Sequence, residues 1–483
     1  MRFKIEDKAL SAYLWDFGGK FIKQGVSLVI TIILARILSP NDFGLLASIV
    51  VFTSLSNVFS DMGLSGSIIQ RTRVLPIHLH SVFYFNLFIA SLLTLIMFFC
   101  APLIGSYYGE PKLVLLARVM SVSFILDAFN TIQNALIKKD LKFKYFAKFR
   151  LFSSVLSGIV GVVLAFNGYG VWALVVQMLF ELVIYDICVW KISTYTPKPQ
   201  FSFKALKTLW GFGFRIFIAK FLNNLYQQFD ILVIGKVLSF VTLGFYQRAK
   251  SLNGMINSYS TESIMNIMFP LLSKMQNNKK MFLEKVNEVY DIILILSFFL
   301  SGLLFLISED FIIILLTEKW RPTIEIFKIM VIGGFILPIN GLFVTILSSK
   351  GNSKKFLKLE VIKKILFLLP LIFFIYSKNV NAFLYLNLLV GIITLLVNFY
   401  FVQKEIEVYW FVFFKPLFFY AFFLVILIYS LTYLFTFIEG NNFLHLMSVS
   451  FTYLIIFVVV GVILKLPGTN HITKLLKKVR YNL

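Results

Sequence analysis

The chain has 483 residues, of which 59% are hydrophobic and only 14% are charged, and 56 of them are Phe. A soluble domain is nearer half apolar and a quarter charged, so this composition excludes an ordinary soluble protein. A net charge of +23 would indicate nucleic-acid binding in a soluble chain. In a membrane chain it fits the excess of Lys and Arg on cytoplasmic loops, and we expect no nucleic-acid partner.

Apolar stretches long enough to cross a bilayer as helices follow one another along the chain, separated by short polar breaks. They lack the strict alternation of barrel strands. We therefore predict an all-α integral membrane protein with about 14 transmembrane helices. In chain order the predicted helices cover residues 12–38, 43–65, 81–107, 113–137, 145–166, 169–191, 209–235, 241–268, 286–307, 323–348, 357–375, 382–401, 411–434 and 444–464. The first, seventh and eighth are the least apolar.

Lys and Arg residues indicate the orientation of these helices. They gather in alternate loops, for example at residues 138–150, 350–364 and 474–480, whereas the intervening loops carry few. Because positive loops stay in the cytoplasm, this pattern predicts that both termini are cytoplasmic.

An internal repeat separates two parts of the chain by 200 residues. The two segments share a basic residue followed by Leu, Ser and Gly at matching positions: Arg36, Leu38, Ser39 and Gly44 against Lys236, Leu238, Ser239 and Gly244. Six predicted helices separate the copies, so the repeats should be parallel and related by a pseudo-two-fold axis along the membrane normal. We predict an N-lobe at 1–200 (helices 1–6) and a C-lobe at 201–403 (helices 7–12). Two additional C-terminal helices and a basic cytoplasmic tail then fill 404–483.

Polar side chains form a stripe on the first predicted helix and again on the seventh. They recur at spacings of three and four residues, which places them on one helical face. A charge inside the bilayer costs at least ~2.5 kcal/mol, so it normally faces a cavity or a partner. Lys and Arg suit a diphosphate, and amides suit sugar hydroxyls. We predict a substrate cavity between the lobes, lined by Lys20, Lys23, Gln24, Lys220, Asn223, Asn224, Gln227, Gln228, Arg248 and Lys250.

Other interpretations of these polar residues stay open. Lysines near helix ends can reach the head groups instead of a cavity. The intramembrane carboxylates could couple transport to an ion, or could simply neutralise the cationic groups; they are Asp61, Asp127, Asp230 and Glu262. The sequence has no phosphate-binding loop and no catalytic carboxylate constellation. The isolated Cys100 and Cys188 and the scattered histidines predict no metal site, and we expect neither cofactor nor enzymatic activity.

Several segments resemble the Wzx-type polysaccharide flippases of the multidrug/oligosaccharidyl-lipid/polysaccharide exporter superfamily. The resemblance begins at residues 34–44, LARILSPNDFG, and covers most of the first 350 residues. Its other segments are DMGLS at 61–65 with IQR at 69–71, GYGVWAL at 168–174, YQRA at 246–249, FPLL at 269–272, and EKW at 318–320 with Pro322.

The resemblance implies a flippase of the bacterial inner membrane. Its cargo would be an undecaprenyl-diphosphate-linked oligosaccharide, moved from the cytoplasmic to the periplasmic leaflet by alternating access. The glycan would serve lipopolysaccharide O-antigen, capsule or exopolysaccharide assembly, with a polysaccharide polymerase and a chain-length regulator as candidate partners besides membrane lipids. Three alternatives stay open: a cation-coupled multidrug exporter, a peptidoglycan lipid flippase, and a membrane-embedded glycosyltransferase or polymerase.

Overall fold

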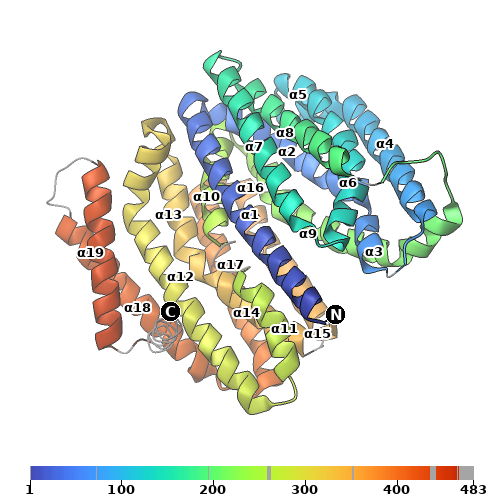
Figure 1. The fold of residues 1–483 in the computed structure, drawn as a ribbon. Helices are drawn as coiled ribbons and strands as arrows, with labels where there is room; N and C mark the ends of the chain where they lie inside the picture. The colour runs from blue at the N-terminus through green and yellow to red at the C-terminus, as the bar shows by residue number, and fades with distance from the viewer. Residues whose placement is uncertain are drawn as a thin grey trace. The chain divides into compact units, whose positions relative to one another are not determined.

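The computed structural model describes residues 2–71, 73–193, 195–257, 263–350, 353–435, 442–464 and 466. Their regular secondary structure is helical throughout (Figure 1). The first half contains α1 (Arg2–Ile37), α2 (Pro40–Asp61), α3 (Leu64–Gln70), α4 (Pro76–Tyr108), α5 (Lys112–Met120), α6 (Val122–Lys139), α7 (Phe143–Phe166), α8 (Val171–Ile192), α9 (Phe203–Val237) and α10 (Phe240–Asn257). The second half contains α11 (Ser263–Met275), α12 (Lys279–Leu316), η2 (Glu318–Trp320), α13 (Thr323–Ile332), η3 (Gly333–Phe335), α14 (Ile336–Ser349), α15 (Ser353–Leu366), α16 (Leu368–Ser377), α17 (Val380–Ile406), α18 (Trp410–Phe435) and α19 (Asn442–Ile463).

Helices occupy every predicted range, but several ranges are broken. The range 113–137 splits into α5 and α6 at Ser121, whose backbone carbonyl accepts a hydrogen bond from the Thr94 hydroxyl at 3.0 Å. The range 357–375 splits between α15 and α16. The range 43–65 ends early, at Asp61, because Met62 and Gly63 adopt left-handed backbone conformations. The range 241–268 crosses residues 258–262, which lie outside the described residues.

Nine helical segments of the described chain are long and apolar enough to cross a membrane. Neither α1, α9 nor α10 is among them, in agreement with the low hydropathy predicted for the first, seventh and eighth helices. The physical reason is the same in each case: polar side chains interrupt the apolar surface.

The sequence repeat corresponds to a repeated structural joint. Helices α1 and α9 end at Ile37 and Val237, 200 residues apart, and α2 and α10 begin three residues later. Ser39 and Ser239 stand before these helices, and each hydroxyl accepts a hydrogen bond from the backbone amide three residues on, at 3.3 and 3.2 Å. Both joints therefore use the same Ser cap, which satisfies an amide that a helix start leaves unpaired.

The N-terminal ends of α2 and α10 touch each other through the glycines of this repeat. A Cβ placed on Gly44 would lie 1.8 Å from the backbone oxygen of Phe240, and a Cβ on Gly244 would lie 2.0 Å from that of Pro40. Since Pro40 and Phe240 occupy matching positions, the contact is reciprocal, as in an isologous interface. Only glycine at both positions permits this separation.

The chain divides into two compact units, Met1–Gly244 and Phe245–Leu483. In the first unit α1 packs along α7, where Gly158 lets the side chain of Ile30 approach the α7 backbone. Ser154, Ser157 and Gly161 are also buried on α7. Small residues of this kind allow membrane helices to approach closely enough for van der Waals packing.

In the second unit the long helix α12 packs against α14, α18 and α19. Polar contacts supplement its apolar core: the Tyr290 hydroxyl donates to the Phe413 carbonyl at 2.8 Å, and the Tyr453 hydroxyl donates to the Phe299 carbonyl at 3.0 Å. His445 of α19 lies 2.6 Å from the buried carboxylate of Asp310 on α12. These bonds attach α18 and α19 to the remainder of the unit.

Candidate functional site

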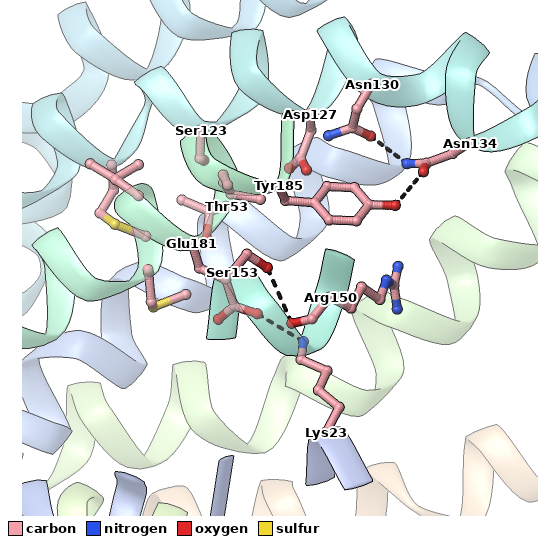
Figure 2. A pocket seen from close by; sticks show the side chains of 14 residues that line it. Lys23, Thr53, Ser123, Asp127, Asn130, Asn134, Arg150, Ser153, Glu181 and Tyr185 are labelled. Atoms are coloured by element: carbon pink, nitrogen blue, oxygen red, sulfur yellow. Dashed lines mark hydrogen bonds and ion pairs between the residues drawn. The ribbon is translucent and has the colours of Figure 1, made fainter. Parts of the chain in front are cut away.

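The first unit contains a polar cavity of about 360 Å³ between α1, α2, α5, α6, α7 and α8. Figure 2 shows the side chains that line it. Charged, amide and hydroxyl groups predominate among them; the polar lining residues are Lys23, Thr53, Ser123, Asp127, Asn130, Asn134, Arg150, Ser153, Glu181 and Tyr185. Three segments that form the cavity are nevertheless long and apolar enough to cross a membrane: α5 together with α6, α7, and α8.

Lys23 and Glu181 form an ion pair across this cavity. The Lys23 ammonium of α1 lies 2.9 Å from the Glu181 carboxylate of α8, and the two side chains are 33% and 27% exposed. Partial exposure leaves both groups accessible from the cavity (Figure 2). Lys23 is therefore a cation paired with a carboxylate, Glu181, that sequence reasoning did not single out.

A chain of hydrogen bonds orders the amides on α6. The Tyr185 hydroxyl donates to the Asn134 side-chain oxygen, and the Asn134 amide donates to the Asn130 oxygen at 2.6 Å. The Asn130 amide donates in turn to the carboxylate of Asp186 at 2.8 Å. Each bond fixes the orientation of an amide that would otherwise be costly to bury.

Asp127 and Arg150 also line the cavity but are held differently. The Arg150 guanidinium stacks over the ring of Phe146, 4.1 Å from its centroid, and lies 5.8 Å from the ring centroid of Tyr185. Within the described residues, no hydrogen bond or ion pair reaches the Asp127 carboxylate. The cavity thus offers a carboxylate acceptor that the protein itself leaves unfilled.

A second polar cavity of about 270 Å³ shares Asp127, Asn130 and Asn134 with the first. Its other charged residues include Asp61 and Lys220, whose carboxylate and ammonium lie 3.5 Å apart. Asp61 also accepts hydrogen bonds from the backbone amide and the hydroxyl of Ser65, at 3.0 and 2.9 Å. The two cavities therefore lie next to each other along α6.

The predicted site residues occupy different environments. On α1, Lys20 is exposed and Gln24 is half-buried. On α9, Asn223 and Gln227 are exposed, whereas Gln228 and Asp230 are half-buried.

Asn224 of α9 is engaged with α2, because its amide donates to the Ser54 carbonyl at 3.1 Å. In the second unit Arg248 is buried, with its guanidinium 5.5 Å from the ring centroid of Trp320, and Lys250 is half-buried. Glu262 lies outside the described residues. The structure therefore brings Lys23, Lys220, Asp61 and Asp127 to the two neighbouring cavities.

Sequence reasoning missed Arg150, Asn130, Asn134, Glu181 and Asp186. The α6 stripe had a detectable signal, since Asp127, Asn130 and Asn134 follow one another at spacings of three and four residues. Glu181 and Asp186 were detectable as carboxylates within an apolar helix. Arg150 had no such signal, because a basic residue beside a cytoplasmic loop is ordinary.

Known proteins resemble the chain over most of its length. The profile of the polysaccharide biosynthesis protein family matches residues 33–325. The chain belongs to this family. It is 24% identical to the lipopolysaccharide biosynthesis protein WzxC of Escherichia coli over 75% of this chain and 74% of that protein. It is 23% identical to the succinoglycan biosynthesis transport protein ExoT of Rhizobium meliloti over 70% of this chain and 68% of that protein.

Solved structures extend the comparison to the fold. A lipid II flippase, MurJ, in an inward closed conformation matches with a TM-score of 0.75 at 15% identity, over 93% of this chain and 98% of that one. An inward-facing multidrug resistance transporter of the MOP superfamily matches with a TM-score of 0.63 at 13% identity, over 80% and 94%. The resemblance seen in the sequence is thereby confirmed. The protein is a Wzx-like, multi-pass membrane transporter with the MOP fold, and it is not an enzyme.

Proposed function

We propose that the protein moves undecaprenyl-diphosphate-linked oligosaccharide repeat units from the cytoplasmic to the periplasmic leaflet of a bacterial inner membrane. The glycan would serve lipopolysaccharide O-antigen, capsule or exopolysaccharide biosynthesis. Two six-helix lobes related by a pseudo-two-fold axis, with two further C-terminal helices, would alternate access to the cargo. About 14 spans and cytoplasmic termini would complete this arrangement.

The observation that carries the proposal is the pair of polar cavities with shared lining residues in a member of the polysaccharide biosynthesis protein family. Lys23 and Lys220 are each paired with a carboxylate, so a diphosphate can replace that carboxylate as the partner of the lysine. The ordered amides of α6 and the predicted amides of α9 suit sugar hydroxyls. Lys20, Lys23 and Lys220 would attract the diphosphate, and Arg248 and Lys250 would guide release.

Net transport needs a source of free energy. Removal of the flipped glycan by a periplasmic polymerase, acting with a chain-length regulator, would supply one. A cation bound at Asp61, Asp127 or Asp230 would supply another, and Asp127 is favoured because its carboxylate has no hydrogen-bond or ion-pair partner among the described residues. Both sources are compatible with alternating access.

The test is a double replacement, Lys20→Ala with Lys220→Ala, in proteoliposomes that carry a fluorescent lipid-linked oligosaccharide. We expect flipping, measured as quenching by a membrane-impermeant reductant, to fall at least tenfold with normal membrane insertion. Lys112→Ala is the matched control, since Lys112 is exposed and lines neither cavity. Full flipping by the double variant would refute the assigned cargo path.

Two further measurements separate the alternatives within the superfamily. Rescue of a strain that lacks its peptidoglycan lipid flippase would indicate lipid II as cargo. Export of cationic drugs, with no glycan-lipid flipping, would indicate a drug transporter. Accumulation of a lipid-linked glycan inside a strain that lacks this protein would identify the glycan.

A further inference from the structure

An apolar cavity of about 580 Å³ lies between α4, α9 and α2, apart from the two polar cavities. Helix α4 contributes lining residues from Leu93 to Tyr107, and α9 contributes Phe229, Leu232 and Val233. Among the described residues that line it, none is charged. A polar cargo head would lose its hydration there without compensation.

The lining of the cavity extends along α4, a helix that is long and apolar enough to cross a membrane. Leu93 and Tyr107 are 14 residues apart on one helix, a distance of about 21 Å at 1.5 Å per residue. That distance is roughly two thirds of a ~30 Å hydrocarbon core. The lining side chains of Ile96, Leu103 and Phe229 are exposed, so the cavity is open on one side.

A cation stands at one end of this groove. The Lys236 ammonium donates to the backbone carbonyl of Tyr107 and lies 4.9 Å from the centroid of its ring. Lys236 follows Leu232 and Val233 by four and three residues, so it continues the same face of α9 one turn further. Tyr and Lys together are typical of the membrane–water interface, which places this end at the head groups.

We infer that this groove holds the polyprenyl tail of the cargo, with its phosphate beside Lys236. The inference rests on the proposed function, because that function supplies a lipid with a single long apolar tail and an anionic head. The groove is apolar along its length and has one exposed ammonium at its end, which matches a lipid with one apolar tail and an anionic head. A phospholipid carries two tails, only one of which the channel would take.

The position of the groove on α9 gives it a role in transport. Asn223, Gln227 and Asp230 occupy another face of the same helix, by its 3.6-residue period. A single helix would thus contact the tail on one face and the sugars on another. Since α9 ends at the interface beside Lys236, the groove suits the lipid in the leaflet at that end, which is the periplasmic leaflet in the proposed orientation.

The test uses a polyprenyl monophosphate without sugar that carries a photoreactive diazirine on its tail. The full-length protein in nanodiscs is irradiated with this probe, and cross-linked peptides are mapped by mass spectrometry. The key variant is Ile96→Trp, which fills the groove. Leu95→Trp is the matched control, since Leu95 is 54% exposed against 49% for Ile96 but does not line the groove.

We expect wild type and Leu95→Trp to cross-link within α4 and α9, and Ile96→Trp to lose at least tenfold of that yield. Lys236→Gln should lower the yield severalfold without filling the groove, which keeps the test valid if Ile96→Trp is unstable. An excess of phosphatidylglycerol should not compete. Equal yields in all variants, or full competition by phosphatidylglycerol, would overturn the inference. Because the probe lacks sugar, a failure of glycan-lipid flipping by wild type would count against the proposed function alone.

Discussion

Replacing Gly44 by Ala should disturb the reciprocal contact between α2 and α10. The new Cβ would stand 1.8 Å from the Phe240 carbonyl oxygen, whereas ordinary contact begins at 3.4 Å. The two backbones would therefore have to separate by about 1.6 Å, the difference between these distances, and such overpacking typically costs about 1–3 kcal/mol.

In a transporter this cost applies only to the conformation in which the contact is closed. A penalty of 1–3 kcal/mol shifts a two-state equilibrium by about 5- to 150-fold. We therefore expect Gly44→Ala to favour the form in which α2 and α10 have separated. Gly244→Ala should act similarly, since its Cβ would lie 2.0 Å from the Pro40 carbonyl oxygen. The double variant should add little to either single one, because one separation relieves both clashes.

The assay is labelling of a cysteine at position 48 by a membrane-impermeant maleimide, with Cys100 and Cys188 replaced. Ser48 is fully buried one turn beyond Gly44, and its hydroxyl donates to the Gly44 carbonyl at 3.0 Å. Gly254→Ala is the control, since nothing lies within 4 Å of its Cβ position on α10. If Gly44→Ala shows the same labelling and the same thermal stability as the protein without this substitution, the reasoning is refuted.

Two further predictions concern ion pairs. Glu181→Gln should leave Lys23 half-buried without its carboxylate and destabilise the protein by about 1–2 kcal/mol, less than a fully buried pair loses because both groups are partly exposed. The double variant Lys23→Met with Glu181→Met removes both charges and should restore most of the lost thermal stability. If stability does not recover, loss of the ion pair is not the cause of the destabilisation. Hydrogen bonds from Arg321 lower the pKa of the Glu318 carboxyl. The pair therefore stabilises the fold at a pH above the ordinary pKa of Glu, and this stabilisation is lost as the pH falls through the lowered pKa of Glu318. Arg321→Gln should raise the Glu318 pKa toward its ordinary value in an NMR titration, and an unchanged titration curve would contradict the assignment.

Hydropathy and the repeat predicted where most of the helices lie and where the two repeated joints fall. Apolar runs marked most of the helical ranges, with α1, α9 and α10 as exceptions, and the 200-residue offset located two serine-capped turns that are structurally alike. The break at Ser121 could not be predicted, because it lies within an apolar run and is stabilised by Thr94, 27 residues earlier in the chain. Window-based hydropathy does not detect such tertiary hydrogen bonds.

The candidate site was predictable only in part. Lysines on α1 and α9 were visible as intramembrane charges, but their partners were not. Glu181 meets Lys23 across 158 positions of sequence, and Asp61 meets Lys220 across 159. Pairing over such separations depends on how the helices assemble, which periodicity within one helix does not specify.

Asp61 has a property that bears on how tightly any cargo could be held. Its carboxylate accepts two bonds from Ser65 at 2.9 and 3.0 Å but lies 3.5 Å from Lys220. If an incoming anion captures the ammonium, Asp61 keeps both bonds to Ser65. Occupancy of Lys220 would then exchange one anionic partner for another without leaving the Asp61 carboxylate unpaired.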